Sequence, residues 1–258
     1  MILFLAGTSD ARALAIELQQ TGYSVLATVV TESAAKSLVE ANIETHIGRL
    51  TAEDMAQFIQ SKNLQAVVDA SHPFAEEASK NALAGAKLAN VPYIRYERES
   101  QRFGDEKLIL VKDYEEAANL AAKKRGVIML TTGSKTLGTF TEKLIGLEDT
   151  RVIARMLPRL DNMEKCAELG VEQKNIVAIQ GPFSKELNIA LYKQYGVTLM
   201  ITKESGKVGS VDEKLTAALE CGIETIMIAR PKVAYENVHS TFDDVIQALQ
   251  TQLQLSQI

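Results

Sequence analysis

Residues 1–22, MILFLAGTSDARALAIELQQTG, decide the fold. Ile2–Ala6 is a continuous apolar run, as expected of a strand that is buried on both faces. Gly7–Ser9 turns the chain, and Asp10–Gln20 then places apolar residues at helical spacing. A strand, a short polar turn and a helix in this order predict the first unit of a parallel α/β sheet.

The same alternation of apolar runs and helical segments continues along the chain. The charged stretch Arg98–Lys107 interrupts it, so we expect a boundary there between domains at 1–100 and 101–258. Strands that alternate with helices predict parallel sheets covered on both faces. The sequence therefore predicts an α/β protein of two Rossmann-like or flavodoxin-like domains with a ligand cleft between them. The further strands that we expect are Ser24–Val30, Glu44–Ile47, Ala66–Ala70, Pro92–Tyr96, Val127–Leu130, Arg151–Arg155, Ile176–Ile179, Thr198–Ile201 and Thr225–Ala229. The expected helices include Phe74–Leu88, Asp113–Lys124 and Asp243–Leu253, and one that begins after Thr51.

Composition narrows the classes of function. The chain has 28 Lys and Arg against 33 Asp and Glu, a net charge of −5, which disfavours binding to nucleic acid. Cys166 and Cys221 have no cysteine or histidine partner at metal-ligand spacing, so we expect no metal site and no disulfide, and a cytoplasmic location. No apolar run approaches the ~18 residues of a membrane-spanning helix.

The residues that directly follow each strand are the candidates for a site, because ligands of parallel α/β sheets bind outside the carboxyl ends of the strands. Gly7, Thr8, Ser9 and Asp10 follow the first strand, where backbone N–H groups and a helix N-terminus favour a cofactor phosphate. Only one of the three glycines of the dinucleotide fingerprint is present. A tight turn with Ser9 as helix cap is therefore the alternative.

Glu32 and Arg49 follow the second and third strands. An acid about 20 residues past the glycine turn binds the adenosine ribose in dinucleotide-binding folds, and its charge repels a 2′-phosphate. Glu32 therefore favours NADH over NADPH, with a solvated loop acid as the alternative. Arg49 is a candidate phosphate ligand or a surface residue.

Ser71, His72 and Pro73 follow the fourth strand. In the first half of the chain, this segment is the strongest candidate for a site, because several polar groups converge at one turn. His72 can donate a proton or bind a cofactor amide or a substrate carboxylate, and Pro73 suits the first position of a helix. The alternative is that Ser71 and His72 cap that helix. Arg95 and Arg98 flank an aromatic at the end of the fifth strand. They are predicted to bind substrate carboxylates in bidentate fashion, or else to form an interdomain salt-bridge network.

The second half places basic and hydroxyl side chains after its strands. Local positive charge in an acidic chain attracts a polyanionic ligand, and the low aromatic content argues against a stacking platform for single strands. The basic residues on this predicted edge are Lys135, Arg155, Arg159, Lys203, Lys207 and Arg230. The predicted substrate-binding residues are Thr132, Gly133, Ser134, Lys135, Arg155, Gln180, Lys203 and Ser205.

Several of these segments match one known family in order. They are GTSDARALA at 7–15, GRL at 48–50, VVDASHPFA at 67–75, PYIRYERE at 92–99, TTGSKTL at 131–137, ARMLP at 154–158, QGPFS at 180–184 and TKESG at 202–206. None is specific alone, but the ordered set resembles the precorrin-6A reductase family of corrin (vitamin B12) biosynthesis.

The resemblance implies reduction of one macrocycle double bond of precorrin-6A, to give precorrin-6B, by hydride from a reduced nicotinamide nucleotide. Relatives of the aerobic pathway use metal-free substrate and NADPH, and relatives of the anaerobic pathway use the cobalt complex and NADH. NADPH-using relatives tend to have a basic, Gly-containing segment where this chain has Thr31–Ala35. We therefore expect NADH, with NADPH as the alternative, and cobalt-precorrin-6A, whose cobalt belongs to the substrate. The carboxylates of this tetrapyrrole match the basic edge.

The expected mechanism assigns a role to each turn. The 7–9 turn holds the pyrophosphate, Glu32 the ribose, and Ser71 and His72 lie near the nicotinamide, while the second domain orients the macrocycle. His72, then Lys203, is the candidate proton donor, with solvent as the alternative.

Two other classes of function stay open. One is an S-adenosylmethionine-dependent enzyme such as a methyltransferase of the same pathway, since an acid after strand two also suits an adenosine ribose. The other is a non-catalytic module that binds an anionic ligand without any nicotinamide dependence. The residues do not determine the oligomeric state.

Overall fold

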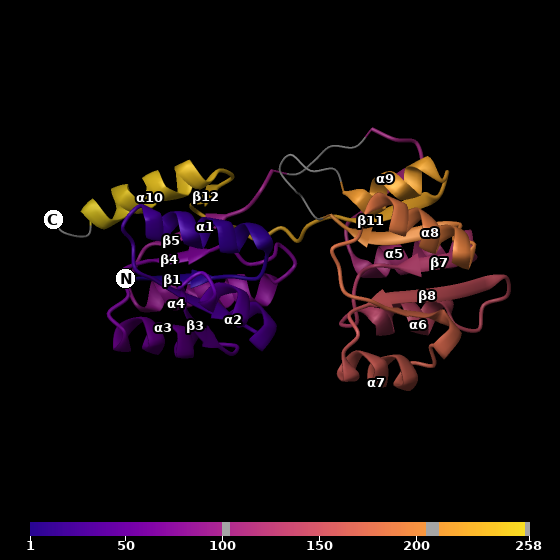
Figure 1. The fold of residues 1–258 in the computed structure, drawn as a ribbon, viewed down its shortest axis with the longest axis horizontal. Coiled ribbons are helices and arrows are strands. Elements are labelled where there is room, and N and C mark those ends of the chain that lie inside the picture. The colour runs from indigo at the N-terminus through magenta and orange to yellow at the C-terminus, as the bar shows by residue number, and fades with distance from the viewer. Residues whose placement is uncertain (100–103, 205–211, 256–258) are drawn as a thin grey trace. The chain divides into compact units, whose positions relative to one another are not determined.

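The computed structural model describes residues 1–99, 104–204 and 212–255. The chain divides into unit 1, residues 1–99 and 232–258, and unit 2, residues 100–231. Each unit contains one six-stranded parallel sheet with helices packed against it (Figure 1). The predicted α/β architecture with two parallel sheets is confirmed.

Sheet 1 is formed by β1 (Ile2–Leu5), β2 (Val25–Val29), β3 (Glu44–Ile47), β4 (Val67–Asp69), β5 (Tyr93–Tyr96) and β12 (Val238–His239). Its strand order is β12-β5-β4-β1-β2-β3. The chain winds outward from β1 to β3 and then returns to the other side of β1 for β4 and β5. The connections that follow β1 and β4 therefore lead to opposite faces of the sheet, and ligands of open α/β sheets bind at this topological switch point.

Helices cover both faces of sheet 1. On one face α1 (Ser9–Gln20), α2 (Glu32–Val39) and α10 (Phe242–Leu255) pack against Ile2 and Phe4. On the other face α3 (Ala52–Ser61) and α4 (Glu76–Leu88) pack against Leu3 and Leu5. The period-2 alternation of a strand thus divides one apolar run between two cores.

Threonine side chains cap the helices that follow β1, β2 and β3. Thr8 Oγ1 accepts a hydrogen bond from Ala11 N at 3.1 Å, so Ser9 is not the cap. Thr31 caps α2 in the same way, and α2 therefore begins at Glu32. Thr51 caps α3, as predicted, in a reciprocal capping box with Asp54.

The helix after β4 begins later than predicted. Pro73 lies in the turn and not at the first helical position, because α4 starts at Glu76 with Ala75 as its N-cap. The intervening residues bond to one another instead, with Ala75 N donating to His72 O at 2.7 Å.

Sheet 2 is formed by β6 (Leu108–Val111), β7 (Gly126–Leu130), β8 (Thr150–Met156), β9 (Ile176–Ala178), β10 (Leu199–Lys203) and β11 (Glu224–Ile228). Its strand order, β6-β11-β10-β7-β8-β9, places the switch point between β7 and β10. The strand β6 was not predicted. It lies at the edge of the sheet, where Leu110 is 63% exposed, and its flanks are polar.

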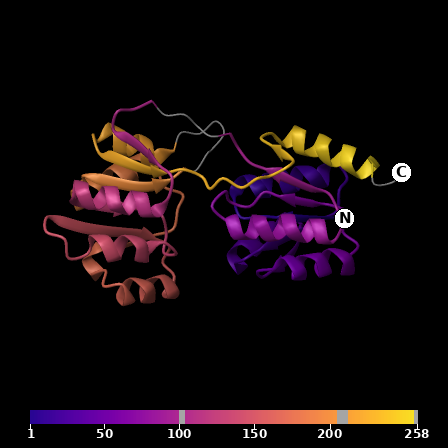
Figure 2. The same cartoon turned by 180° about the vertical axis from the view of Figure 1, so that it is seen from behind.

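Helices also cover both faces of sheet 2. Met129 and Met200 pack with α8 (Lys185–Tyr195) and α9 (Glu213–Glu220). The helices α5 (Tyr114–Lys124) and α6 (Leu137–Leu144) contact each other and, respectively, β11 and β8 (Figure 2). The remaining elements are α7 (Leu160–Glu168) and the 3-10 helix η1 (Gln173–Asn175). Across the described ranges, no helix combines the length and apolar character needed to cross a bilayer.

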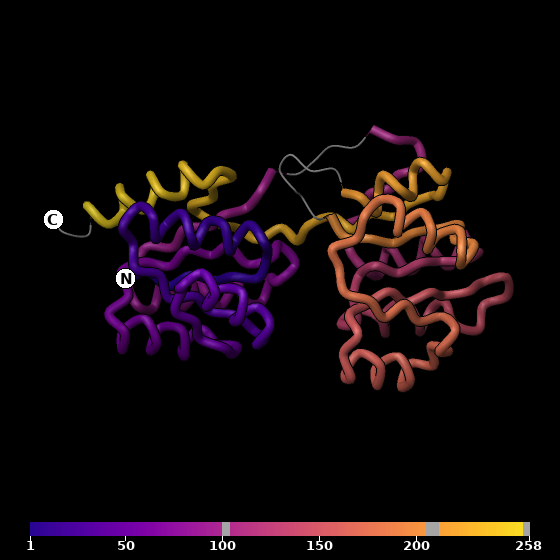
Figure 3. The backbone as a smooth tube through the Cα atoms, viewed as in Figure 1, coloured from indigo at the N-terminus to yellow at the C-terminus, as the bar shows by residue number. Residues whose placement is uncertain are grey.

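The C-terminal segment belongs to unit 1, whereas the predicted second domain included it. Its strand β12 pairs with β5, with Val238 opposite Arg95. In α10, Val245 and Leu249 are fully buried in the core of unit 1, and Phe242 contacts Tyr96 edge-on. Figure 3 shows this yellow segment against the indigo start of the chain. An amphipathic pattern predicts that a helix face is buried, but not which sheet buries it.

Leu249→Ala tests this packing. We expect the free energy of unfolding of unit 1 to fall by about 2–5 kcal/mol, because the substitution leaves a cavity in a closed core. Urea unfolding followed by circular dichroism measures the change. Gln250→Ala, at the adjacent exposed position, is the matched control. Equal stability of the two variants would contradict the assignment of α10 to this core.

Candidate functional site

The turns after β1 and β4 adjoin at the switch point of sheet 1. Gly7 is exposed, and a Cβ atom there would lie 3.8 Å from the His72 backbone nitrogen. The helix α1 begins directly afterwards. Thr8 satisfies the Ala11 amide, whereas the first-turn amides of Ser9 and Asp10 precede the intrahelical ladder. This glycine turn at the N-terminus of a twelve-residue helix fits a phosphate group.

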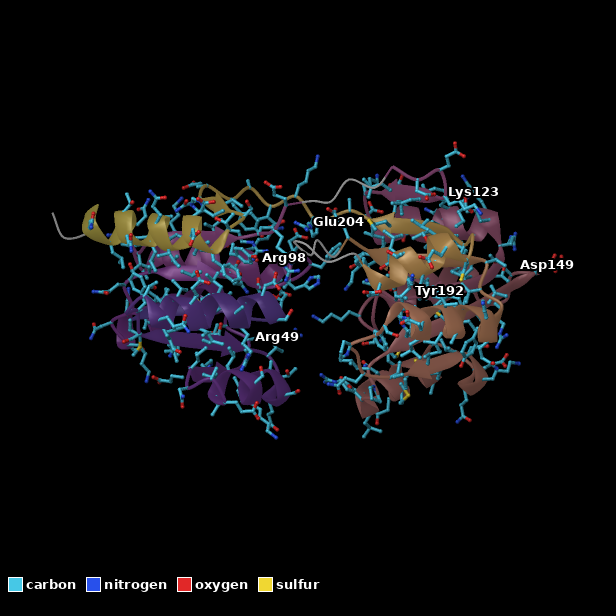
Figure 4. All side chains as sticks on the ribbon, turned by 45° about the horizontal axis from the view of Figure 1, so that its top comes forward. Arg49, Arg98, Lys123, Asp149, Tyr192 and Glu204 are labelled. Atoms are coloured by element: carbon cyan, nitrogen blue, oxygen red, sulfur yellow. The ribbon has the colours of Figure 1, made fainter. Side chains whose placement is uncertain are left out.

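Asp10 and Arg98 form an ion pair beside this turn. Asp10 lies in the first turn of α1, where its carboxylate would otherwise oppose an anion. Arg98, labelled in Figure 4, reaches it from the chain that follows β5. The pair offsets that negative charge and places a guanidinium at the helix N-terminus. The structure thus brings together two residues that were predicted for different ligands.

Glu32 and Arg49 lie farther along the same edge. Glu32 is the exposed first residue of α2, after β2, which neighbours β1. Arg49 is exposed and follows β3, one strand farther out (Figure 4). Glu32 therefore stands where dinucleotide-binding sheets place their ribose-binding acid, and its role stays a prediction.

Hydrogen bonds to neighbouring residues hold the Ser71–Pro73 turn. Ser71 is buried, and its amide donates to Asp69 Oδ1 at 2.9 Å. His72 is half-buried, and its Nδ1 accepts from Phe74 N at 3.2 Å. Because Nδ1 is the acceptor, the neutral ring carries its proton on Nε2. His72 therefore has the tautomer that can donate a hydrogen bond through Nε2.

Arg95 is not placed to bind a substrate. Its side chain is fully buried, with Nη1 2.9 Å from Asp69 Oδ1 and Nε 3.1 Å from Glu97 Oε2. The prediction of a bidentate substrate contact is therefore wrong for Arg95, because the carboxylates that it binds belong to its own unit. Burial opposes the charge of Arg95, but Asp69, Tyr235 and Glu97 outweigh burial and raise its pKa.

Sequence reasoning missed Asp69. Its signal is an acid at the end of the apolar run Ala66–Ala70, because a carboxylate that follows buried strand residues needs a charged or hydrogen-bonding partner.

The switch point of sheet 2 presents hydroxyl groups. Its turn runs from Thr131 to Thr136 and contains Gly133 at φ +85°, a conformation that favours glycine. Within the described parts of the chain, the buried Thr132 and Thr136 Oγ1 atoms have no hydrogen-bond partner. A buried hydroxyl of this kind is typically satisfied by water or by a ligand.

Positive charge gathers beside these hydroxyls. Lys203 ends β10, which pairs with β7. Burial lowers the pKa of Lys203, and the charges of Lys214 and Lys135 lower it further. Lys214 also contacts Asp212 at 2.9 Å. This lysine cluster, Lys135, Lys203 and Lys214, suits a carboxylate-rich ligand. Lys214 was missed because it lies within α9 and not after a strand.

The other predicted site residues of unit 2 are spread over different strands. Arg155 is buried, donates to Asn188 Oδ1 at 2.6 Å and stacks on Phe183. Gln180 is exposed after the edge strand β9. Ser205 and Lys207 lie outside the described residues.

Two basic residues of the predicted edge are paired with acids of their own unit. Arg159 contacts both carboxylate oxygens of Asp161, at 2.9 and 2.8 Å. The Arg230 amide donates to Glu204 Oε2 at 3.2 Å, and its side chain forms an ion pair with the same carboxylate. Each of these pairings offsets positive charge at the predicted edge.

A pocket of about 200 Å³ lies at the opposite end of sheet 2, at the start of β8. Arg151 lines it and donates to Asn175 Oδ1 at 2.7 Å. Because none of the strand-end turns borders it, this pocket is separate from both switch points. Among the described residues, no three His, Cys, Asp or Glu side chains are grouped to bind a metal.

Known proteins with related sequences span nearly the whole chain. A cobalt-precorrin-6A reductase from Priestia megaterium is 64% identical over 252 residues, covering 98% of this chain and 99% of that protein. A cobalt-precorrin-6A reductase from Methanothermobacter thermautotrophicus is 34% identical, covering 96% of this chain and 84% of that protein. A precorrin-6A reductase from Rhodococcus erythropolis is 28% identical, covering 96% and 95%.

The fold is also similar to that of a solved structure. The solved structure of CobK precorrin-6A reductase superposes with a TM-score of 0.79 at 22% identity, covering 97% of this chain and 96% of that one. The family model of precorrin-6x reductase CbiJ/CobK matches residues 1–250. The ordered strand-end segments and this match agree: the chain belongs to the precorrin-6x reductase CbiJ/CobK family.

Proposed function

We propose that this chain is a cobalt-precorrin-6A reductase of cobalamin biosynthesis that takes hydride from a reduced nicotinamide nucleotide, with NADH preferred. The observation that carries the proposal is 64% identity, over 98% of the chain, to a protein named cobalt-precorrin-6A reductase. The product is cobalt-precorrin-6B. A cytoplasmic location, with Cys166 and Cys221 free, is part of the same proposal.

The switch point of sheet 1 would hold the dinucleotide. The amides at the start of α1 and the Gly7 turn bind the pyrophosphate, and Glu32 accepts hydrogen bonds from the adenosine ribose. The dinucleotide supplies the hydride when bound. The approach of the Ser71–Pro73 backbone to Gly7 supports a role for His72 at this site.

The switch point of sheet 2 would hold the macrocycle. The lysine cluster attracts the substrate's carboxylates, and Thr132 Oγ1 provides a buried hydroxyl that a carboxylate oxygen can satisfy. The cobalt ion enters with the substrate and needs no ligand from the chain. Most of the rate enhancement comes from holding hydride donor and acceptor in register.

Two side chains are candidates for the proton that completes the reduction. His72 would donate in its imidazolium form, because the neutral ring that accepts from Phe74 N is too weak an acid. Lys203 has a lowered pKa, which makes its ammonium a stronger acid than an ordinary lysine.

Anaerobic turnover tests the function. Cobalt-precorrin-6A is offered with NADH and with NADPH, and loss of the reduced-nicotinamide absorbance is followed. The account expects turnover with both and a higher kcat/KM for NADH. No turnover with either nucleotide, using substrate that a known reductase consumes, would contradict the proposal.

Glu32→Arg tests the preference between the two nucleotides. Removing the carboxylate and adding a cation should shift the ratio of kcat/KM values at least tenfold toward NADPH, because about 1.4 kcal/mol of altered interaction with the 2′-phosphate suffices. Glu40→Arg makes the same change of charge at the other end of α2 and is the control. An equal shift in both variants would mean that net charge, and not contact at Glu32, sets the preference.

The pH profile of kcat distinguishes the proton donors. If Lys203 donates, kcat falls as pH rises through its lowered pKa, below the ordinary 10.5, because deprotonation removes the acid. Lys203→Arg should then move this fall to higher pH, since arginine stays protonated. A fall that stays in place in Lys203→Arg but disappears in His72→Gln would assign the proton to His72.

A further inference from the structure

A buried ion pair lies directly beneath the Ser71–Pro73 turn. Asp69 ends β4 and Arg95 lies opposite it in β5. Both side chains are fully buried, and Arg95 Nη1 is 2.9 Å from Asp69 Oδ1. Buried charges of this kind need hydrogen-bonded partners for their remaining polar atoms.

Two of the pair's hydrogen bonds go to one residue of the turn. Asp69 Oδ1 accepts from the Ser71 amide at 2.9 Å, and Arg95 Nη1 lies 3.3 Å from Ser71 Oγ. The same hydroxyl is 3.2 Å from Ser79 Oγ in α4. Ser71 is therefore held through its backbone and its side chain, by two strands and a helix.

Two tyrosines complete the network. Tyr93 Oη donates to Asp69 Oδ2 at 2.7 Å, and burial, with the charge of Asp69, raises the pKa of Tyr93, so it remains a donor. The Tyr235 ring stacks on Tyr93 and lies 5.2 Å from Arg95 Cζ. These rings keep water from the ion pair, which strengthens its hydrogen bonds.

One atom of the network is unsatisfied. Within the described residues, the buried Arg95 Nη2 has no hydrogen-bond partner. Well-packed apolar residues of similar volume often stabilise a core as well as a buried ion pair does. Stability alone therefore does not account for placing an incompletely bonded guanidinium here, whereas the pair's two contacts to Ser71, one from Arg95 and one from Asp69, do.

We propose that Arg95 and Asp69 are positioning residues that fix the Ser71–Pro73 turn beside Gly7 and so set the place of the His72 ring. The inference rests on the proposed role of this switch point in binding the dinucleotide. Neither side chain touches a ligand, and both act through Ser71. A misplacement of about 1 Å at a reacting centre can cost about 100-fold in rate. Holding the turn rigid is therefore a functional reason for a buried charge pair at this position.

Tyr93→Phe and Ser71→Ala test the proposal, because each removes one link and leaves both charges paired. Amide hydrogen exchange without nucleotide should accelerate about threefold to tenfold over residues 71–75, as expected for one lost hydrogen bond. The matched control is Tyr23→Phe, which removes a phenol hydroxyl just before the amino end of β2. It should leave exchange in this turn unchanged.

Nucleotide binding and turnover are measured on the same proteins. The expected result is a several-fold lower kcat in Tyr93→Phe and Ser71→Ala, with the thermal midpoint close to that of Tyr23→Phe. Unchanged exchange at 71–75 would overturn the proposal, and so would faster exchange with wild-type kcat and affinity for NADH. If the wild type consumes neither nucleotide, the proposed function fails, and the exchange result alone decides whether the pair holds the turn.

Discussion

Parallel pairing of β1 with both β2 and β4 is the constraint on which unit 1 depends. β1 is buried on both faces of the sheet. The strands that pair with it determine which turns lie next to the Gly7 turn at the carboxyl edge. Reversal of the winding at this strand sends the connections after β1 and β4 to opposite faces of the sheet, and their turns, at Gly7 and at Ser71–Pro73, adjoin at the edge. Unit 2 repeats the arrangement at β7 and β10, so each unit has one place where polar turns can receive a ligand.

The two switch points differ in the charge that they present. In unit 1 a helix N-terminus and the Asp10–Arg98 pair suit a phosphate held by backbone amides. In unit 2 lysine ammonium groups stand beside buried hydroxyls, which suits carboxylates. The difference supports assigning the nucleotide to one unit and a polyanionic macrocycle to the other.

The sequence pattern predicted most of both sheets, because continuous apolar runs between helical segments are typical of central parallel strands. It missed the edge strands β12 and β6, the latter with Leu110 exposed. It assigned α10 to the wrong unit, since the helical pattern carries no information about which sheet lies opposite. Both errors concern long-range pairing, which local residue patterns do not encode.

The sequence likewise predicted part of the candidate site and missed or misassigned other residues. Strand-end position located Gly7, Glu32, His72 and Lys203 at carboxyl edges, because topology alone puts them there. Arg95 was misassigned, since its role depends on the register that places Asp69 opposite it. Lys214 was missed, because its effect on Lys203 arises from packing between elements.

Ligand-induced hydrogen exchange determines whether the switch point of sheet 1 binds the dinucleotide. NADH is added to the full chain and amide exchange is compared across both switch points. We predict slower exchange at residues 8–12 and 71–75. Protection confined to residues 131–136 and 203–204 would place the nucleotide on unit 2 and contradict it.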